Sequence, residues 1–131
     1  MTPAATPTRF LSLEDVLFVT HVATGGQPVI RDVGLLDSAT HRPRTTLFGA
    51  DAYPSLYDKA AALLESIVRN RALVDGNKRT AWLACSTFLD LNDAPLDAPD
   101  DEAYELVIGL AEGRVELDEI AATLEGWCGS A

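Results

Sequence analysis

The segment from Asn70 to Ala81, which reads NRALVDGNKRTA, combines residue types that can bind an anion. Gly76 and Asn77 stand where a loop opens directly into a predicted helix, so several backbone N–H groups there have no intrahelical acceptor. The partial positive charge at a helix N-terminus adds to their attraction for phosphate. Lys78 and Arg79 add full charges, and an arginine can hold two phosphate oxygens at once. The pattern predicts a phosphate-binding site in this segment.

A carboxylate and a cluster of cations support that prediction. Asp75 directly precedes the glycine and is well placed to hold Mg²⁺ between two phosphates. Taken singly, each residue has an ordinary explanation, because Asp-Gly is a common turn and cations are often simply solvated. The chain has 10 Lys and Arg against 20 Asp and Glu, a formal net charge of -10. A concentration of cations on so acidic a molecule favours an anion site, and four of them gather here: Arg69, Arg71, Lys78 and Arg79.

The run from Asp75 to Thr80 resembles the motif loop of the Fic/Doc family, whose pattern is His-x-Phe-x-Asp/Glu-Gly/Ala-Asn-Lys/Gly-Arg. The resemblance extends over nearly the whole chain. It includes the early helix followed by two glycines, the Arg42-Pro43 region, the Tyr53-Pro54 helix start and the total length. It implies an all-α fold, a Fic/Doc-like helical bundle with a short β-hairpin flap at Thr40 to Phe48 that holds a target segment beside a nucleotide.

The resemblance also implies roles for the loop residues. Phosphate and Mg²⁺ binding falls to Arg69, Asp75, Asn77, Lys78 and Arg79, with Asp75 as the metal ligand and Gly76 providing anion-facing backbone. Lys78 stands where adenylyl-transferring members have glycine, which places the chain with the Doc-type toxins. A downstream arginine of those members is also missing, because Trp82 and Leu83 stand there. Doc-type toxins move the terminal phosphate of ATP onto a threonine of elongation factor Tu, and nucleotidyl (AMP) transfer is the alternative reaction.

The departure that matters most is Arg71, which stands at the position of the family's catalytic histidine. An arginine stays protonated at working pH and cannot take a proton from the attacking hydroxyl. Loss of a positioned general base costs ~10²- to 10⁴-fold in rate. Two explanations remain: an inactivating substitution that allows a toxic protein to be produced, or a natural relative that kept binding and lost chemistry. We favour the first, because the rest of the loop is intact.

Five other residues could be assigned to the site and are more simply interpreted structurally. His21, in the first helix, and His41, in the flap, are poor substitutes for the missing base. Trp82 and Phe88 could stack on adenine, but they share a predicted helix face with core residues. Leu73 replaces the motif phenylalanine, and we expect it to anchor the loop by packing.

Helices must position the loop, and the sequence indicates them by the spacing of apolar residues and by residues that begin or end a helix. Apolar residues recur at three- and four-residue spacing in several stretches, and the 78–91 stripe looks like the central buried helix. The stretch from Thr40 to Phe48, which Gly49 bounds, could form a loop or a short hairpin. It is the candidate for β-strand structure in this sequence. The predicted helices cover residues 13 to 24, about 32 to 39, 54 to 70, 78 to 91, 100 to 111 and 118 to 127.

Length and composition limit the remaining possibilities. The 131 residues fit a flexible N-terminal lead-in at 1–10 and a single Fic/Doc domain at 11–131. The acidic balance disfavours direct DNA binding, and no apolar stretch reaches the ~20 residues of a membrane span. Without a signal peptide, and with Cys85 and Cys128 as free thiols, we expect a cytoplasmic protein.

The resemblance implies control by a separate Phd-like antitoxin whose disordered tail folds onto the toxin surface. Two non-enzymatic hypotheses stay open. The chain could be a module that binds a nucleotide or partner without chemistry, for which Arg71 is the best argument, or a purely structural helical bundle.

Overall fold

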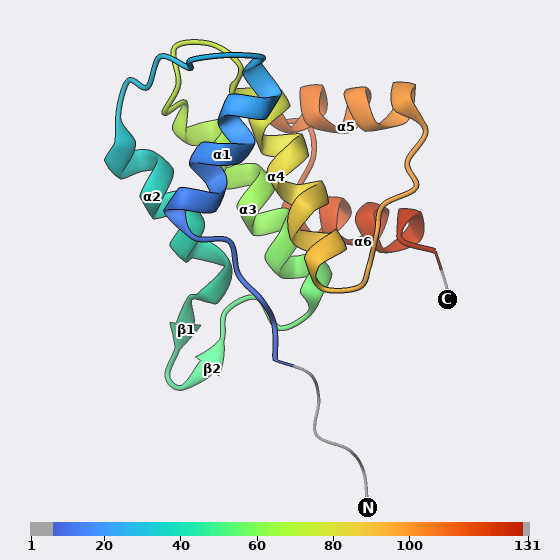
Figure 1. Cartoon of the computed structure of the whole chain (residues 1–131). Coiled ribbons are helices and arrows are strands. Elements are labelled where there is room, and N and C mark those ends of the chain that lie inside the picture. The colour runs from blue at the N-terminus through green and yellow to red at the C-terminus, as the bar shows by residue number, and fades with distance from the viewer. Residues whose placement is uncertain (1–6, 130–131) are drawn as a thin grey trace, which may run out of the picture.

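The computed structural model describes residues 7–129 and shows a helical bundle with one small hairpin (Figure 1). Its helices are α1 (Leu13–Thr24), α2 (Val33–His41), α3 (Leu56–Asn70), α4 (Asn77–Leu91), α5 (Asp100–Ala111) and α6 (Leu117–Trp127). A 3₁₀ turn, η1 (Arg42–Arg44), leads into the antiparallel strands β1 (Thr46–Leu47) and β2 (Ala50–Asp51). The all-α class with a hairpin is confirmed. No helix in the described part of the chain is both long and apolar enough to cross a membrane.

The centre of the bundle is α3, which contacts α2, α4, α5 and α6. Figure 1 shows it, in green, running behind α1 and beside α4. The sequence pattern pointed to residues 78–91 as the central helix, and that expectation was wrong. Small alanines surround the axis of α3 and allow neighbours to approach from several sides, so residues 59–64 are buried without interruption. In α4 the buried residues are restricted to one face.

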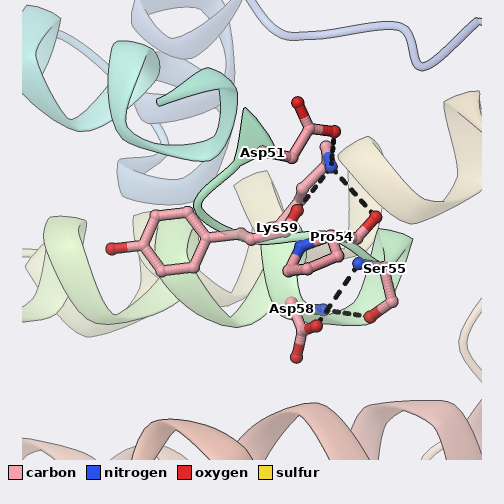
Figure 2. Close-up of polar contacts among 6 residues, drawn as sticks. Asp51, Pro54, Ser55, Asp58 and Lys59 are labelled. Carbon is pink, nitrogen blue, oxygen red and sulfur yellow. Dashed lines mark hydrogen bonds and ion pairs between the residues drawn. The ribbon is translucent and has the colours of Figure 1, made fainter. Parts of the chain in front are cut away.

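Side-chain caps fix where the first three helices begin. In α1, Ser12 and Asp15 form a capping box, and Asp32 caps α2. The sequence placed Pro54 in the first turn of α3, but the helix begins at Leu56. A second capping box explains the difference, because Ser55 Oγ accepts from the Asp58 amide at 3.0 Å and Asp58 Oδ2 accepts from the Ser55 amide at 3.3 Å (Figure 2).

The hairpin is shifted from its predicted position at Thr40 to Phe48. Thr40 belongs to α2, and the strands pair Thr46 with Asp51 and Leu47 with Ala50. The prediction took Gly49 as the boundary, whereas Gly49 lies inside the turn. Its φ of 81° and the φ of 52° at Phe48 are both left-handed, as the tight turns of two-residue hairpins require. The side chain of Phe48 is fully exposed at this tip.

The lead-in predicted for residues 1–10 falls partly outside the described residues, which begin at 7. Arg9 and Phe10 contact the helical body. The Arg9 amide donates to Asn92 Oδ1 at 2.8 Å, and Asn92 Nδ2 donates to the Arg9 carbonyl at 2.8 Å. The Phe10 ring stacks on Phe88 with centroids 6.2 Å apart.

A buried lysine attaches the hairpin to α3. The Lys59 ammonium group donates to Asp51 Oδ2 at 3.1 Å, to the Pro54 carbonyl at 3.2 Å and to the Tyr53 carbonyl (Figure 2). Only 5% of its side chain is exposed, whereas 57% of Asp51 is. An ammonium group buried to this degree is stable only when its donors are satisfied. Lys59 therefore holds the chain between β2 and α3 in place.

We predict that Lys59→Met lowers the free energy of unfolding by about 2 kcal/mol, because it removes charge-assisted hydrogen bonds and leaves two carbonyls without their donor. Asp51→Asn is the matched comparison, since it weakens the ion pair from its exposed side and leaves the carbonyl contacts. It should cost less than about 1 kcal/mol. Urea unfolding followed by circular dichroism measures both. If the two variants lose the same free energy of unfolding, the hydrogen bonds from Lys59 to the carbonyls do not have the role assigned to them.

Candidate functional site

The predicted phosphate loop connects the C-terminus of α3 to the N-terminus of α4. Arg71 ends α3 in a left-handed conformation with φ 49° and ψ 47°, which turns the chain sharply. Ala72 and Leu73 then go into the core, with 2% and 0% exposure. The prediction that Leu73 anchors the loop by packing is confirmed.

Backbone hydrogen bonds attach this loop to the connection between α1 and α2. The amides of Arg31 and Asp32 both donate to the Ala72 carbonyl, at 2.7 and 3.1 Å. Two residues on, the Val74 amide donates to the Val29 carbonyl at 3.0 Å. The two segments form a short antiparallel bridge at Ile30 and Leu73. The loop therefore has a fixed backbone although several of its side chains are exposed.

Asn77 closes the loop with its side chain. Its Oδ1 accepts from the Leu73 amide at 3.0 Å, and its Nδ2 donates to the Leu73 carbonyl at 2.8 Å. The side-chain amide is thus occupied within the protein. Asn77 can offer a ligand its backbone N–H and determines the path of residues 73–77.

The N-terminus of α4 leaves donors free. Gly76 occupies the cap position with φ 86° and supplies no side chain. The Thr80 amide donates to the Gly76 carbonyl at 2.9 Å and is the first in the helix to find such a partner. Among the described residues, the amides of Asn77, Lys78 and Arg79 have no hydrogen-bond acceptor. Together with the helix dipole they make this end of α4 attractive to an anion, whereas the Gly76 amide, which the sequence also assigned to the ligand, donates to Asp75 Oδ1 at 2.9 Å.

All seven residues predicted for the site line one cavity of about 1040 Å³, which they share with α5. Those seven are Arg69, Arg71, Asp75, Gly76, Asn77, Lys78 and Arg79. With Arg31 the lining carries five cations, against three carboxylates from Asp75, Asp100 and Glu112. The cavity is therefore locally positive on a chain whose net charge is -10.

Asp75 fits the role of a ligand for phosphate-bound magnesium. Its Oδ1 accepts from the Gly76 amide at 2.9 Å, and its Oδ2 accepts no hydrogen bond from the described residues. Mg²⁺ beside a nucleotide is typically held by one or two carboxylates and by the phosphates. No group of three or more His, Cys, Asp or Glu side chains suited to a metal occurs in the described part of the chain. Asp75 would thus hold the ion together with the ligand's phosphates.

Neither of the two histidines is among the residues that line this cavity. His21 is exposed in the last turn of α1. His41 lies 3.4 Å from Asp37 and borders a second cavity of about 520 Å³ beside the hairpin. Arg69 lines both cavities and lies between them. The interpretation of His21 as an ordinary helical histidine agrees with its position.

The sequence interpretation of Trp82 was incomplete. Phe88 is a core residue with 1% exposure, as predicted. Trp82 is half-buried, packs edge-to-face on Trp127 at 6.3 Å, and also lines the cavity. Sequence reasoning missed the contribution of α5 altogether. The signal was present as a helical face at three- and four-residue spacing, made of Asp100, Ala103, Tyr104, Val107, Ile108 and Ala111.

The structure defines a helical-bundle protein with one small hairpin and a cationic loop that opens from a cavity into an uncapped helix. Comparisons with known proteins identify its family. Residues 5–89 match the model of the Fic/DOC family. The chain is 52% identical over 126 residues to Toxin Doc of Mycolicibacterium smegmatis (strain ATCC 700084 / mc(2)155), an alignment that covers 95% of this chain and 97% of that protein.

A second relative is more distant. The chain is 30% identical over 108 residues to Protein kinase doc of Escherichia phage P1, with 82% of this chain and 83% of that protein covered. The chain belongs to the Fic/Doc family, and the predicted family is confirmed.

We predict that Gly76→Ala destabilises the protein more than Gly49→Ala. Both glycines have a left-handed φ, near 86° and 81°, so alanine strains the backbone at each. At Gly76 a Cβ would also approach Thr24 Cγ2 at 2.8 Å, whereas nothing lies within 4 Å at Gly49. Gly49→Ala should cost about 1 kcal/mol and Gly76→Ala about 2 to 3 kcal/mol in urea unfolding.

Addition of Thr24→Ser tests the cause. Serine removes Cγ2 and keeps the hydroxyl that donates to the Thr20 carbonyl at 2.8 Å. The Gly76→Ala/Thr24→Ser protein should regain the stability that the contact with Thr24 Cγ2 costs. Only the loss caused by backbone strain at position 76 should remain. If the double variant is no more stable than Gly76→Ala, the loop is not packed on α1 in the way described.

Proposed function

We propose that this protein is a Doc-type toxin that transfers the terminal phosphate of ATP to a hydroxyl of a translation factor similar to elongation factor Tu. One observation carries the proposal: the uncapped N-terminus of α4, with Lys78 and Arg79 beside it, opens into a large cavity on an acidic molecule. The names of the two relatives, Toxin Doc and Protein kinase doc, support this reaction.

Phosphoryl transfer depends mostly on position and charge, because the transferred group carries negative charge on all its equatorial oxygens. In the proposed site the free amides of residues 77–79 hold the phosphate chain. Lys78 and Arg79 neutralise it, and Arg69 approaches from the side that faces the second cavity. Asp75 would hold a Mg²⁺ ion, which would supply further positive charge to the phosphates. Arg79 is oriented by a hydrogen bond from its Nη1 to the Ala23 carbonyl at 3.3 Å.

The same cavity explains why we expect the reaction to be slow. Arg71 lines it, and an arginine cannot accept the proton of the attacking hydroxyl. No histidine lines the cavity to take over that step. We therefore propose that the protein keeps its affinity for the nucleotide but transfers phosphate at a low rate. A degenerate module that binds without any chemistry is the competing proposal, and Arg71 supports it equally.

Lys78 favours phosphate over AMP as the transferred group, because it puts a full charge where adenylyl-transferring members have glycine. Nucleotidyl transfer remains the alternative reaction of the same loop. We also propose, from the family, a cytoplasmic protein controlled by an antitoxin with a disordered, Phd-like tail. Such a tail loses conformational entropy when it folds on binding, and it can cover a large surface.

We predict that Arg71→His raises phosphate transfer to the target by about 10²-fold or more, because it supplies a base that titrates near neutral pH. The left-handed backbone at this position tolerates histidine, so the fold should be kept. Arg71→Asn is the matched control, since asparagine also accepts this conformation but cannot act as the base. The measurement is transfer of radioactive label from ATP to purified elongation factor Tu.

The label position separates the reactions. Labelling from the γ-phosphate supports phosphate transfer, and labelling from the α-phosphate shows nucleotidyl transfer instead. If Arg71→His binds ATP and labels nothing, while Arg71→Asn behaves identically, the non-catalytic module is the correct interpretation.

A further inference from the structure

The cavity has two chemically different walls. The loop wall carries the free amides and the cations, whereas the wall from α5 consists mainly of apolar side chains. Ala103 and Val107 are buried, and Tyr104 stands beside them with 64% of its surface exposed. The wall also carries two carboxylates, Asp100 in the first turn of α5 and Glu112 directly after its last residue. This wall attracts uncharged, flat groups and repels phosphate.

The opposite walls impose an orientation on an elongated ligand. Its anionic end is drawn to the free amides of Asn77–Arg79, and its other end must lie against α5, where carboxylates exclude a second anionic group. Inorganic phosphate would leave the apolar half of the cavity unused. A nucleotide has the matching distribution, because its base is flat and neutral.

Tyr104 is suited to stack on such a base. A tyrosine ring offers a large rigid surface at a low conformational cost, and its exposed face makes no aromatic contact with the described residues. Trp82 enters the cavity from α4, but its ring is already packed edge-to-face on Trp127. Tyr104 is therefore the aromatic ring with a free face in this cavity.

We propose that the exposed face of α5 is the nucleobase wall of the cavity and that the Tyr104 ring stacks on the base. This inference rests on the proposed function and deepens it, since it assigns the half of the nucleotide that the motif loop does not touch. Tyr104 then determines preference for a nucleotide over a bare polyphosphate.

The test compares two ligands that share the phosphates and differ in the base. Calorimetry measures Mg²⁺-ATP and Mg²⁺-tripolyphosphate binding to the full chain. Tyr104→Ala should weaken ATP binding about tenfold, as expected for loss of one base–aromatic stack, and leave tripolyphosphate unchanged. Tyr104→Phe keeps the ring and should bind ATP as the unaltered protein does. Phe18→Ala is the matched control, because Phe18 is 69% exposed on α1 and lies outside the cavity lining.

The outcomes distinguish this inference from the function beneath it. If the unaltered chain binds ATP and Tyr104→Ala binds it equally well, the stacking role is overturned and the phosphate site stands. If Tyr104→Ala weakens both ligands equally, or Tyr104→Phe loses as much as alanine, the ring does not act by stacking. If neither ligand binds the unaltered chain, the phosphate loop and the proposed function fail with it.

Discussion

The site depends on the hydrogen bonds between the Asn77 side chain and the Leu73 backbone. They join the first residue of α4 to a residue buried in the core, at 3.0 and 2.8 Å, and so fix where that helix begins. Because the path of the loop is set by these two bonds, the amides of the first turn point away from the protein's own acceptors. The free donors and the positive helix end are then available to a ligand without further rearrangement.

This arrangement separates support from chemistry. Leu73 packs in the core, Gly76 allows α1 to approach closely, and Arg79 is oriented by a carbonyl of α1. None of these contacts requires a particular residue at position 71 beyond one that tolerates a left-handed backbone. On the opposite side, Lys59 anchors the hairpin to α3 through backbone carbonyls. The loop and the hairpin are therefore both attached to the central helix α3.

The sequence predicted the features that are formed by residues close together in the chain. The candidate site could be predicted because most of its residues are contiguous and their chemistry is unusual on an acidic chain, and the structure groups all seven around one cavity. The hairpin was misplaced because Gly49 can end a segment or sit inside a turn, and the choice depends on strand pairing with Ala50 and Asp51. The wall from α5 was missed because Tyr104 is far from the motif in the chain and meets it through packing.

The backbone and the side chain of Arg71 meet different requirements. Its backbone performs a structural task, since the left-handed turn after α3 sends Ala72 into the core. Its side chain lines the locally positive cavity, where a guanidinium group adds attraction for an anion. Under the proposed function, arginine at this position leaves the fold intact and strengthens the local positive potential, but it cannot accept the proton of the attacking hydroxyl. We therefore expect nucleotide binding to tolerate Arg71 better than phosphate transfer does.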